Sequence, residues 1–247
     1  MIVLLPPSET KRDGGDGPPL HLDSLSSPEL GAVRAALVDE LVDLAADRPA
    51  ARRALGISAS QDSEIDRNAA LRSAPTMPAV ERYTGVLYDA LDAASLDASA
   101  RAFAGEHLAI GSALFGLVGS LDEIPAYRLS YDSRVPGVVL KKLWREPVSA
   151  VVAARPGLLL DLRSEGYAAL GPIPSRPDAV YLRVVSEGPD GRRQALNHFN
   201  KSGKGAFTRR LLEAGIDHAD VDSLLSWARA HDIRLDRGMP GELELVV

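Results

Sequence analysis

The sequence contains no cysteine among its 247 residues. This absence excludes thiol catalysis, cysteine-ligated zinc, iron–sulfur clusters and a disulfide scaffold. Hydrophobic residues make up 45% and charged residues 25% of the chain, which is typical of a globular protein and not of a disordered one. We therefore expect a folded chain with a sizeable core.

Long apolar runs are also missing. The first apolar stretch ends at Pro6-Pro7 and no basic residue precedes it, so it does not resemble a signal peptide. The longest apolar candidate, 108–121, is rich in Gly and Ser and is too short to span a membrane. We therefore expect a cytoplasmic protein without membrane contact, with a monomer as its expected state.

Several well-known motifs are absent as well. The chain has no GxSxG elbow, no GxGxxG fingerprint and no Walker A spacing. Its five histidines are scattered and none joins a carboxylate in a metal-site pattern; His107 is expected to be a packing residue within a helix. We therefore expect neither a metal nor a cofactor, and the sequence leaves open whether the protein is an enzyme.

Acidic residues outnumber basic ones, with 34 Asp+Glu against 28 Lys+Arg and a formal net charge of −6. Because phosphate contacts require Lys and Arg, this balance disfavours binding to bulk nucleic acid. It still permits a local basic site.

Apolar spacing and turn signals predict an α+β or mixed α/β protein, in which helices pack on a mixed sheet. The turn-forming sequence 188–191 predicts an antiparallel hairpin between the strands on either side of it. No repeat or long linker divides the chain, so we predict a single compact domain over 1–247. The predicted helices are 28–47, 62–72, 78–94, 98–117, 140–154, 203–214 and 221–230, and the predicted strands are 2–5, 158–162, 179–185, 194–199 and 242–247.

The segment 191–212 has no acidic residue and is rich in Lys and Arg. Glycines at the start of a helix let backbone N–H groups approach an anion, and the helix dipole favours negative charge there. The segment therefore predicts a phosphate site. The alternative is a solvated hairpin edge followed by an ordinary helix. Its candidate phosphate-binding residues are Lys201, Lys204, Gly205 and Arg209.

Two polar loops follow predicted buried strands, where α/β proteins often place ligand contacts. The first offers Ser8, Thr10 and Lys11, of which Thr10 and Lys11 can hold an anion. The second offers Ser164, Glu165 and Tyr167, with Glu165 as a candidate general acid or base. The alternatives are an ordinary connector and a loop cap.

The pair Tyr127-Arg128 is a further candidate, either for stacking and phosphate binding or for a structural ion pair.

The order of several short motifs resembles the YaaA peroxide-stress protein family. The motifs are Pro-Pro-Ser-Glu-Thr-Lys at 6–11, Tyr-Thr-Gly-Val-Leu-Tyr at 83–88, His-Leu at 107–108 with Ser-Ala-Leu-Phe-Gly at 112–116, Tyr-Arg-Leu at 127–129 and Leu-Arg-Ser-Glu-Gly-Tyr at 162–167. Together with Lys201, Lys204-Gly205 and Arg209 they extend over nearly the whole chain.

The resemblance implies a cytoplasmic bacterial protein that protects against hydrogen peroxide by limiting free intracellular iron. It also implies a helix–hairpin–helix-like element and a positive cleft that binds DNA. Carried over residue by residue, the hairpin glycine falls on Gly85 with Tyr88 nearby, and the Tyr-Arg pair falls on Tyr127 and Arg128. Two positions depart from the family pattern: Thr84 stands where a lysine is expected, and Gly119-Ser120 where Arg-Pro is expected.

Three hypotheses follow. The first is a stress-response protein whose basic cleft binds DNA or another phosphate-bearing ligand. The second is an enzyme that acts on a nucleotide- or nucleoside-like small molecule, with Glu165 as general acid or base. The third is a non-catalytic interaction protein. A pocket of about 300–1,000 Å³ that holds Glu165 and Lys204 would favour the second hypothesis over an open groove.

Overall fold

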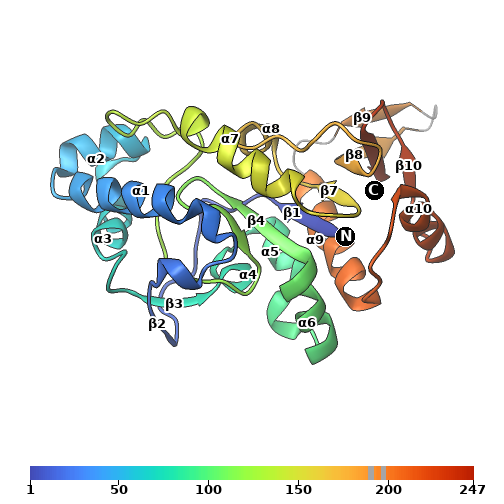
Figure 1. Cartoon of the computed structure of the whole chain (residues 1–247), viewed down its shortest axis with the longest axis horizontal. Helices are drawn as coiled ribbons and strands as arrows, with labels where there is room; N and C mark the ends of the chain where they lie inside the picture. The colour runs from blue at the N-terminus through green and yellow to red at the C-terminus, as the bar shows by residue number, and fades with distance from the viewer. Residues whose placement is uncertain (189–191, 196–198) are drawn as a thin grey trace.

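The computed structural model describes residues 1–188, 192–195 and 199–247. Helices and strands alternate along these residues (Figure 1). The α-helices are α1 (Gly31–Leu44), α2 (Arg48–Leu55), α3 (Ser63–Ala69), α4 (Ala79–Arg82), α5 (Val86–Leu91), α6 (Ala98–His107), α7 (Leu140–Ala153), α8 (Glu165–Ala168), α9 (Phe199–Ala214) and α10 (Val221–Ala230). The strands are β1 (Ile2–Leu5), β2 (Gly17–Pro19), β3 (Pro75–Pro78), β4 (Leu108–Ser112), β5 (Gly116–Gly119), β6 (Glu123–Ile124), β7 (Leu159–Asp161), β8 (Ala179–Glu187), β9 (Arg193–Ala195), β10 (Leu235–Arg237) and β11 (Glu242–Val246).

Within the described residues, one eight-stranded mixed sheet organises the molecule. Its order is β10-β11-β8-β7-β1-β4-β5, and β9 pairs with β8 as well. The strands β1, β4, β7, β8 and β11 run parallel to one another, whereas β5, β9 and β10 are antiparallel to their neighbours. A separate small antiparallel sheet has the order β2-β3-β6. This is the mixed α/β fold, in one compact unit, that the apolar pattern predicts.

The core lies where β1, β4 and β7 meet. Every residue of these three strands is buried, as expected for parallel strands covered by helices on both faces. Figure 1 shows α7 on one side of these strands and α5 and α6 on the other, with α1–α3 grouped at one end of the molecule and α10 at the opposite end. Proline explains where β1 ends, because Pro6 and Pro7 have no N–H group to continue the ladder.

The predicted helix 98–117 is wrong in its second half. Helix α6 ends at His107, and the chain continues as β4, which is paired with β1, and then as β5. A short, fully apolar run fits a buried strand as well as a buried helix, and the central position beside β1 decides for the strand. His107 still packs as expected, with its Nδ1 2.8 Å from the Met1 carbonyl oxygen.

Other boundaries differ less. The predicted helix 28–47 is a 3₁₀ turn (Pro28–Leu30) followed by α1, and 62–72 shortens to α3. The predicted helix 78–94 is divided by Gly85 into α4 and α5, and α2 was not predicted. The two short helices flank a turn, but the helix–hairpin–helix element stays a prediction.

The predicted C-terminal hairpin is present as the antiparallel pair β8 and β9. Its turn at 189–191 and the segment 196–198, with His198, lie outside the described residues. The predicted strand 194–199 is too long, because β9 ends at Ala195 and Phe199 already begins α9. Helix α9 therefore starts four residues before the predicted position Gly203.

Candidate functional site

A cavity of about 830 Å³ opens beside the carboxyl ends of β1 and β7. Parallel strands gather the loops that follow them at one edge of the sheet, which is where α/β proteins bind ligands. Strand β7 pairs with β8 only as far as Tyr181, and β9 pairs with β8 from Val185 onward. Strand β11 pairs with the other edge of β8 over 181–185. Strands β7 and β9 therefore pair with the same edge of β8, and the β8 residues between them, 182–184, line the cavity.

The cavity brings together the loops that the sequence singled out separately. The loop after β1, the turn at Gly85, the loop after β7 and the start of α9 all contribute to its wall. The predicted site residues that line it are Ser8, Thr10, Gly85, Tyr88, Ser164, Glu165, Tyr167, Lys201 and Lys204. The predicted residues Lys11, Tyr127, Arg128, Gly205 and Arg209 do not line it.

Three hydroxyl groups form one end of the cavity. The Thr84 Oγ1 donates to Thr10 Oγ1 at 3.0 Å, and the Ser8 and Thr10 hydroxyls lie 3.2 Å apart. Gly85 turns the chain beside them with φ +96°, a conformation that side chains rarely adopt. A Cβ atom at Gly85 would approach the Ser8 and Thr10 hydroxyls at 3.5 and 3.6 Å. This end can hydrogen-bond to the polar groups of a ligand.

Two tyrosines form the cavity floor. The Tyr88 hydroxyl donates to the Pro6 carbonyl at 2.8 Å and so fixes the loop after β1 to α5. Burial raises the pKa of Tyr88 and of Tyr167 above the ordinary tyrosine value, so both stay neutral donors. Tyr131, which is partly exposed at the rim, contacts Tyr167 edge to face at 5.3 Å between ring centroids.

Lys204 is the buried cation of the cavity wall. Its side chain is 4% exposed, and its Nζ lies 5.4 Å from the centroid of the Tyr181 ring. No hydrogen bond or ion pair joins this Nζ to another of the described residues. The pKa of Lys204 is lowered to about 8, chiefly by burial; Arg183 also acts to lower it, while Asp161 and Glu165 act in the opposite direction.

Glu165 begins α8 at the cavity edge, and its side chain is 82% exposed. It faces Arg183, with 3.5 Å between Oε1 and Nη1. Arg183 is held in place by two hydrogen bonds of 2.7 and 2.8 Å to Glu242 on β11. A solvent-accessible carboxylate beside a fixed guanidinium can accept or donate a proton.

Three arginines of the basic segment 191–212 are engaged by other groups in the described part of the chain. Arg193 pairs with Glu187, Asp236 and Glu244, all from outside the segment. Arg209 pairs with Glu213 and Asp92 and donates to the Leu91 and Asp92 carbonyls. The Arg210 guanidinium donates to the His231 carbonyl. Acidic residues therefore neutralise Arg193 and Arg209, two of the six basic residues of the segment.

Lys201 differs from these arginines. It is exposed in the first turn of α9, at the cavity rim, and it has no ion pair or hydrogen bond within the described part of the chain. Its neighbour Asn200 also lines the cavity and carries a buried side-chain oxygen without a partner. The N-terminal turn of a helix is electropositive, so this rim suits an anion.

Gly205 has a packing role. Helices α5 and α9 approach so closely there that a Cβ atom would lie 2.1 Å from the Leu87 carbonyl oxygen. Only glycine permits this approach, which keeps the first turn of α9 beside α5. Gly205 lies within the helix, six residues after its start, and not in a phosphate-binding turn.

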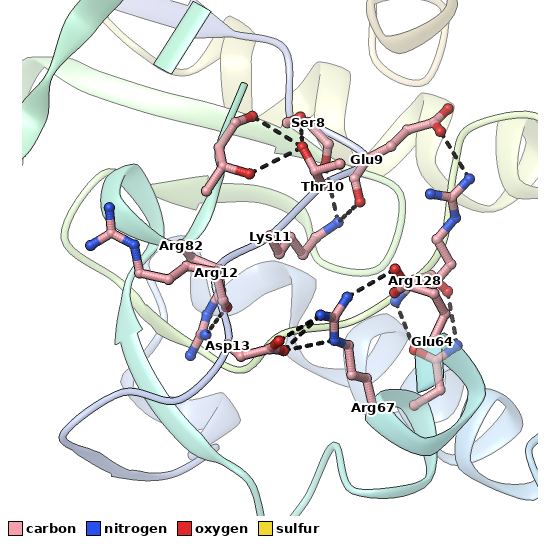
Figure 2. Close-up of polar contacts among 12 residues, drawn as sticks. Ser8, Glu9, Thr10, Lys11, Arg12, Asp13, Glu64, Arg67, Arg82 and Arg128 are labelled. Carbon is pink, nitrogen blue, oxygen red and sulfur yellow. Dashed lines mark hydrogen bonds and ion pairs between the residues drawn. The ribbon is translucent and has the colours of Figure 1, made fainter. Parts of the chain in front are cut away.

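Lys11 belongs to a buried polar network behind the cavity wall (Figure 2). Its Nζ donates to the Ser8 and Glu9 carbonyls at 3.0 and 3.4 Å and lies 4.1 Å from the centroid of the Tyr127 ring. Desolvation lowers the pKa of Lys11 to about 7. Tyr127 extends the network through its hydroxyl, which is 2.8 Å from the Tyr83 hydroxyl and 2.7 Å from the Ser112 hydroxyl.

Arg128 forms an ion pair, which is one of the two alternatives considered from the sequence. Its Nη2 lies 2.8 Å from Glu9 Oε2; a dashed line marks the pair in Figure 2. Its backbone N–H and carbonyl are both bound by the side-chain amide of Asn68. Arg128 thus anchors the loop that carries Ser8 and Thr10 to α3.

Sequence reasoning missed Tyr181 and Arg183. The signal was present in the strand 179–185, where these two polar side chains stand at alternate positions of an otherwise apolar run. Alternate residues share one face of a strand, so the two predict a polar face. The buried pair Asp161 and Arg163, with bonds of 2.8 Å, was also missed.

The described residues contain neither a metal-ligand cluster nor a helix that could cross a membrane. In 1–188, 192–195 and 199–247, no three His, Asp or Glu side chains are grouped so as to hold a metal ion. No helix in these ranges is both long and apolar enough to cross a bilayer.

The fold and the cavity define a mixed α/β protein with a ligand-sized pocket at the carboxyl edge of its parallel strands. The family model described as peroxide stress protein YaaA matches residues 1–231. The chain is 43% identical to a UPF0246 protein of Corynebacterium efficiens, with all of both chains covered. It is 46% identical to one of Streptomyces coelicolor, over 87% of this chain and 84% of that one. The chain belongs to the YaaA (UPF0246) family of peroxide stress proteins.

Proposed function

We propose that this protein serves the peroxide-stress role of its family by binding a phosphate-bearing small molecule of nucleotide size in the cavity. The observation that carries the proposal is the size and content of the cavity. Its volume of about 830 Å³ lies within the range of small-molecule sites, and both Glu165 and Lys204 line it. This combination favours a small ligand enclosed by the cavity over an extended ligand such as DNA.

Each part of the wall has a chemical task in this proposal. Lys201 and the first turn of α9 bind the phosphate, because both are electropositive and Lys201 has no partner within the described ranges. The Ser8, Thr10 and Thr84 hydroxyls bind sugar hydroxyls. Tyr131 is 43% exposed at the rim and offers a ring on which a base can stack.

Glu165 is the proposed general acid or base. Its carboxylate is accessible to solvent, so it can exchange protons with water between turnovers. Arg183 lies beside it, with 3.5 Å between its Nη1 and Glu165 Oε1. The setting is a cytoplasmic one, where nucleotides are abundant and a chain without cysteine is insensitive to thiol oxidation.

DNA is the second candidate, and exposed Lys201 at the rim is the observation that favours it. A phosphate of the DNA backbone would occupy the same place as the phosphate of a nucleotide. Arg193 and Arg209 are paired with acids, Arg210 donates to a backbone carbonyl, and the net charge is −6. Binding through few phosphate contacts would be weak and would depend only slightly on salt.

The test is a calorimetric titration of the whole chain with adenosine monophosphate, inorganic phosphate and duplex DNA, each at two salt concentrations. We expect the nucleotide to bind more tightly than inorganic phosphate. Lys201→Met should weaken the binding of both nucleotide and phosphate, on the order of tenfold, because a charge-assisted hydrogen bond is lost. Lys142→Met, at an exposed position of α7 outside the cavity, is the matched control and should bind normally.

Three outcomes separate the candidates. Binding of the nucleotide that competes with DNA supports the cavity. Tight, strongly salt-dependent DNA binding without nucleotide binding supports an open DNA surface instead. No binding of any of the three ligands would overturn both and leave the non-catalytic interaction protein.

A further inference from the structure

The amine of Lys204 is unlike the other buried cations in the described part of the chain. Arg34, Arg82, Arg163 and Lys11 are also nearly inaccessible, but each donates hydrogen bonds to carbonyl or carboxylate oxygens. Lys204 is equally inaccessible and donates none. A buried polar group without a partner is costly, so such a group usually marks a functional site.

The surroundings of Lys204 favour a neutral amine. Lys204 is 4% exposed, its Nζ lies 5.4 Å from the centroid of the Tyr181 ring, and a second cation, Arg183, lies over the same ring at 5.4 Å. Burial next to another cation is the arrangement that turns a lysine into a nucleophile. The pKa of about 8 agrees with this geometry.

We propose that Lys204 forms a Schiff base with an aldehyde or ketone group of a phosphate-bearing ligand in the cavity. The inference rests on the proposed function, because Lys201 and the first turn of α9 have to hold the phosphate. Lys204 attacks the carbonyl carbon of the ligand, and Lys201 with the first turn of α9 at the cavity rim binds the phosphate.

The reaction balances with the groups on the cavity wall. The neutral Nζ attacks the carbonyl carbon, a C–N bond forms as the C=O π bond breaks, and Glu165 carries one proton from the nitrogen to the carbonyl oxygen, directly or through water, to give a neutral carbinolamine. Glu165 then carries the second nitrogen proton to the hydroxyl group, the C–O bond breaks, and the hydroxyl group leaves as water. The products are an imine and one water molecule, and no electrons leave the pair of reactants. Hydrolysis reverses the sequence.

A simple phosphate clamp is the competing role for Lys204. A clamp works best with an ammonium that keeps its charge and reaches the ligand from solvent, which describes Lys201. Burial beside Arg183 would weaken a clamp, because the two together disfavour the charged form and outweigh the opposite effect of Asp161 and Glu165, whereas a neutral amine promotes nucleophilic attack. The arrangement therefore divides the two tasks between the two lysines of α9.

The test uses pyridoxal 5′-phosphate, which carries both an aldehyde and a phosphate, with cyanoborohydride to reduce any imine to a stable amine. The chain has only five lysines, Lys11, Lys141, Lys142, Lys201 and Lys204, so peptide mass spectrometry assigns each adduct. At about pH 8, a lysine with a pKa near 8 has about a hundredfold more neutral amine than an ordinary lysine. We expect Lys204 to be modified at least about tenfold faster than Lys141 and Lys142, since lower basicity offsets part of this advantage.

Two variants complete the design. Lys204→Arg keeps the positive charge but has no amine, and should lose the fast adduct. Lys142→Arg is the matched control and should keep it. Should Lys204→Arg fail to fold, the site-resolved rates in the unmodified sequence still decide the matter.

Equal rates at all exposed lysines, or a fast adduct only at Lys201 or Lys11, would overturn the inference. Adenosine monophosphate separates it from the proposed function. Nucleotide binding without a fast Lys204 adduct refutes the Schiff base alone. A fast Lys204 adduct that neither nucleotide nor inorganic phosphate slows refutes the phosphate site and retains the reactive amine.

Discussion

Lys11 and Lys204 form a natural comparison, because both are buried lysines with lowered pKa values near the same cavity. The Lys11 region is closed: the ammonium is bound by two carbonyls and two tyrosine rings, and Arg128 and Glu9 neutralise each other beside it. The Lys204 region is open, because its amine faces a cavity and has no partner among the residues described. Desolvation shifts both pKa values, but only an unpaired amine is available to a ligand.

Replacing Arg82 should destabilise the closed region around Lys11 more than any other change considered below. Its guanidinium donates to four carbonyls, those of Arg12, Gly14, Pro75 and Ile124. Arg82→Met should lower the free energy of unfolding by about 3–5 kcal/mol, because these buried acceptors lose their donors. Urea denaturation measures the change. Arg72→Met is the control: its exposed pair with Asp39 should contribute less than about 1 kcal/mol, and equal losses in the two variants would contradict the distinction.

The pH dependence of stability tests both regions together. Lysine in the unfolded chain keeps its proton to about pH 10, whereas folded Lys11 and Lys204 release theirs at about 7 and about 8. The unfolded state therefore binds more protons between these limits, and stability rises with pH by about 1 kcal/mol per pH unit for each lysine. Urea denaturation at several values from about pH 7 to about pH 9 should show this rise, and it should be smaller in Lys11→Met and in Lys204→Met. A fall in stability over the range would disprove the shifts.

Replacing Lys11 and Lys204 one at a time compares what the contacts of each lysine contribute to the free energy of unfolding. At about pH 9 both amines are largely neutral in the folded protein, so their deprotonation costs are similar and the remaining difference comes from contacts. Lys11→Met leaves the Ser8 and Glu9 carbonyls without their donor, so it should be less stable than Lys204→Met by about 1–3 kcal/mol. Thermal and urea unfolding of the Lys11→Met and Lys204→Met variants would measure this difference in stability. Equal stabilities would mean that the Lys11 contacts contribute nothing.

Arg209 gives the smallest expected effect. It was a candidate for phosphate binding, but it lies outside the cavity wall and its guanidinium is engaged with Glu213 and the end of α5. Arg209→Met should leave the affinity for adenosine monophosphate within about twofold and cost less than about 1 kcal/mol of stability. A large loss of ligand or DNA affinity in this variant would instead support an open basic surface.

Local patterns predicted most of the fold. The short apolar strands, the amphipathic helices and the hairpin signal each depend on a few neighbouring residues, and they were located from those residues. Leu108–Ser112 was assigned to a helix because its neighbours alone do not determine its conformation. Pairing with β1, whose residues are distant in sequence, determines it.

The candidate site shows the same limit. Ser8, Glu165 and Lys204 were identified because each follows a strand or begins a helix, and the cavity contains all three. The neutralisation of Arg193 by Glu187, Asp236 and Glu244 could not be foreseen. Local sequence shows a charge, but the partners of that charge come from the tertiary fold.

The position of β1 at the centre of the sheet has a consequence for folding during synthesis. Val3 pairs with Leu108 on one side and with Leu160 on the other. Strand β1 therefore leaves the ribosome before both of its partners, and its apolar side chains stay exposed until the partners emerge. Such non-local pairing slows folding, and it makes the nascent chain a natural client of chaperones that shield apolar segments.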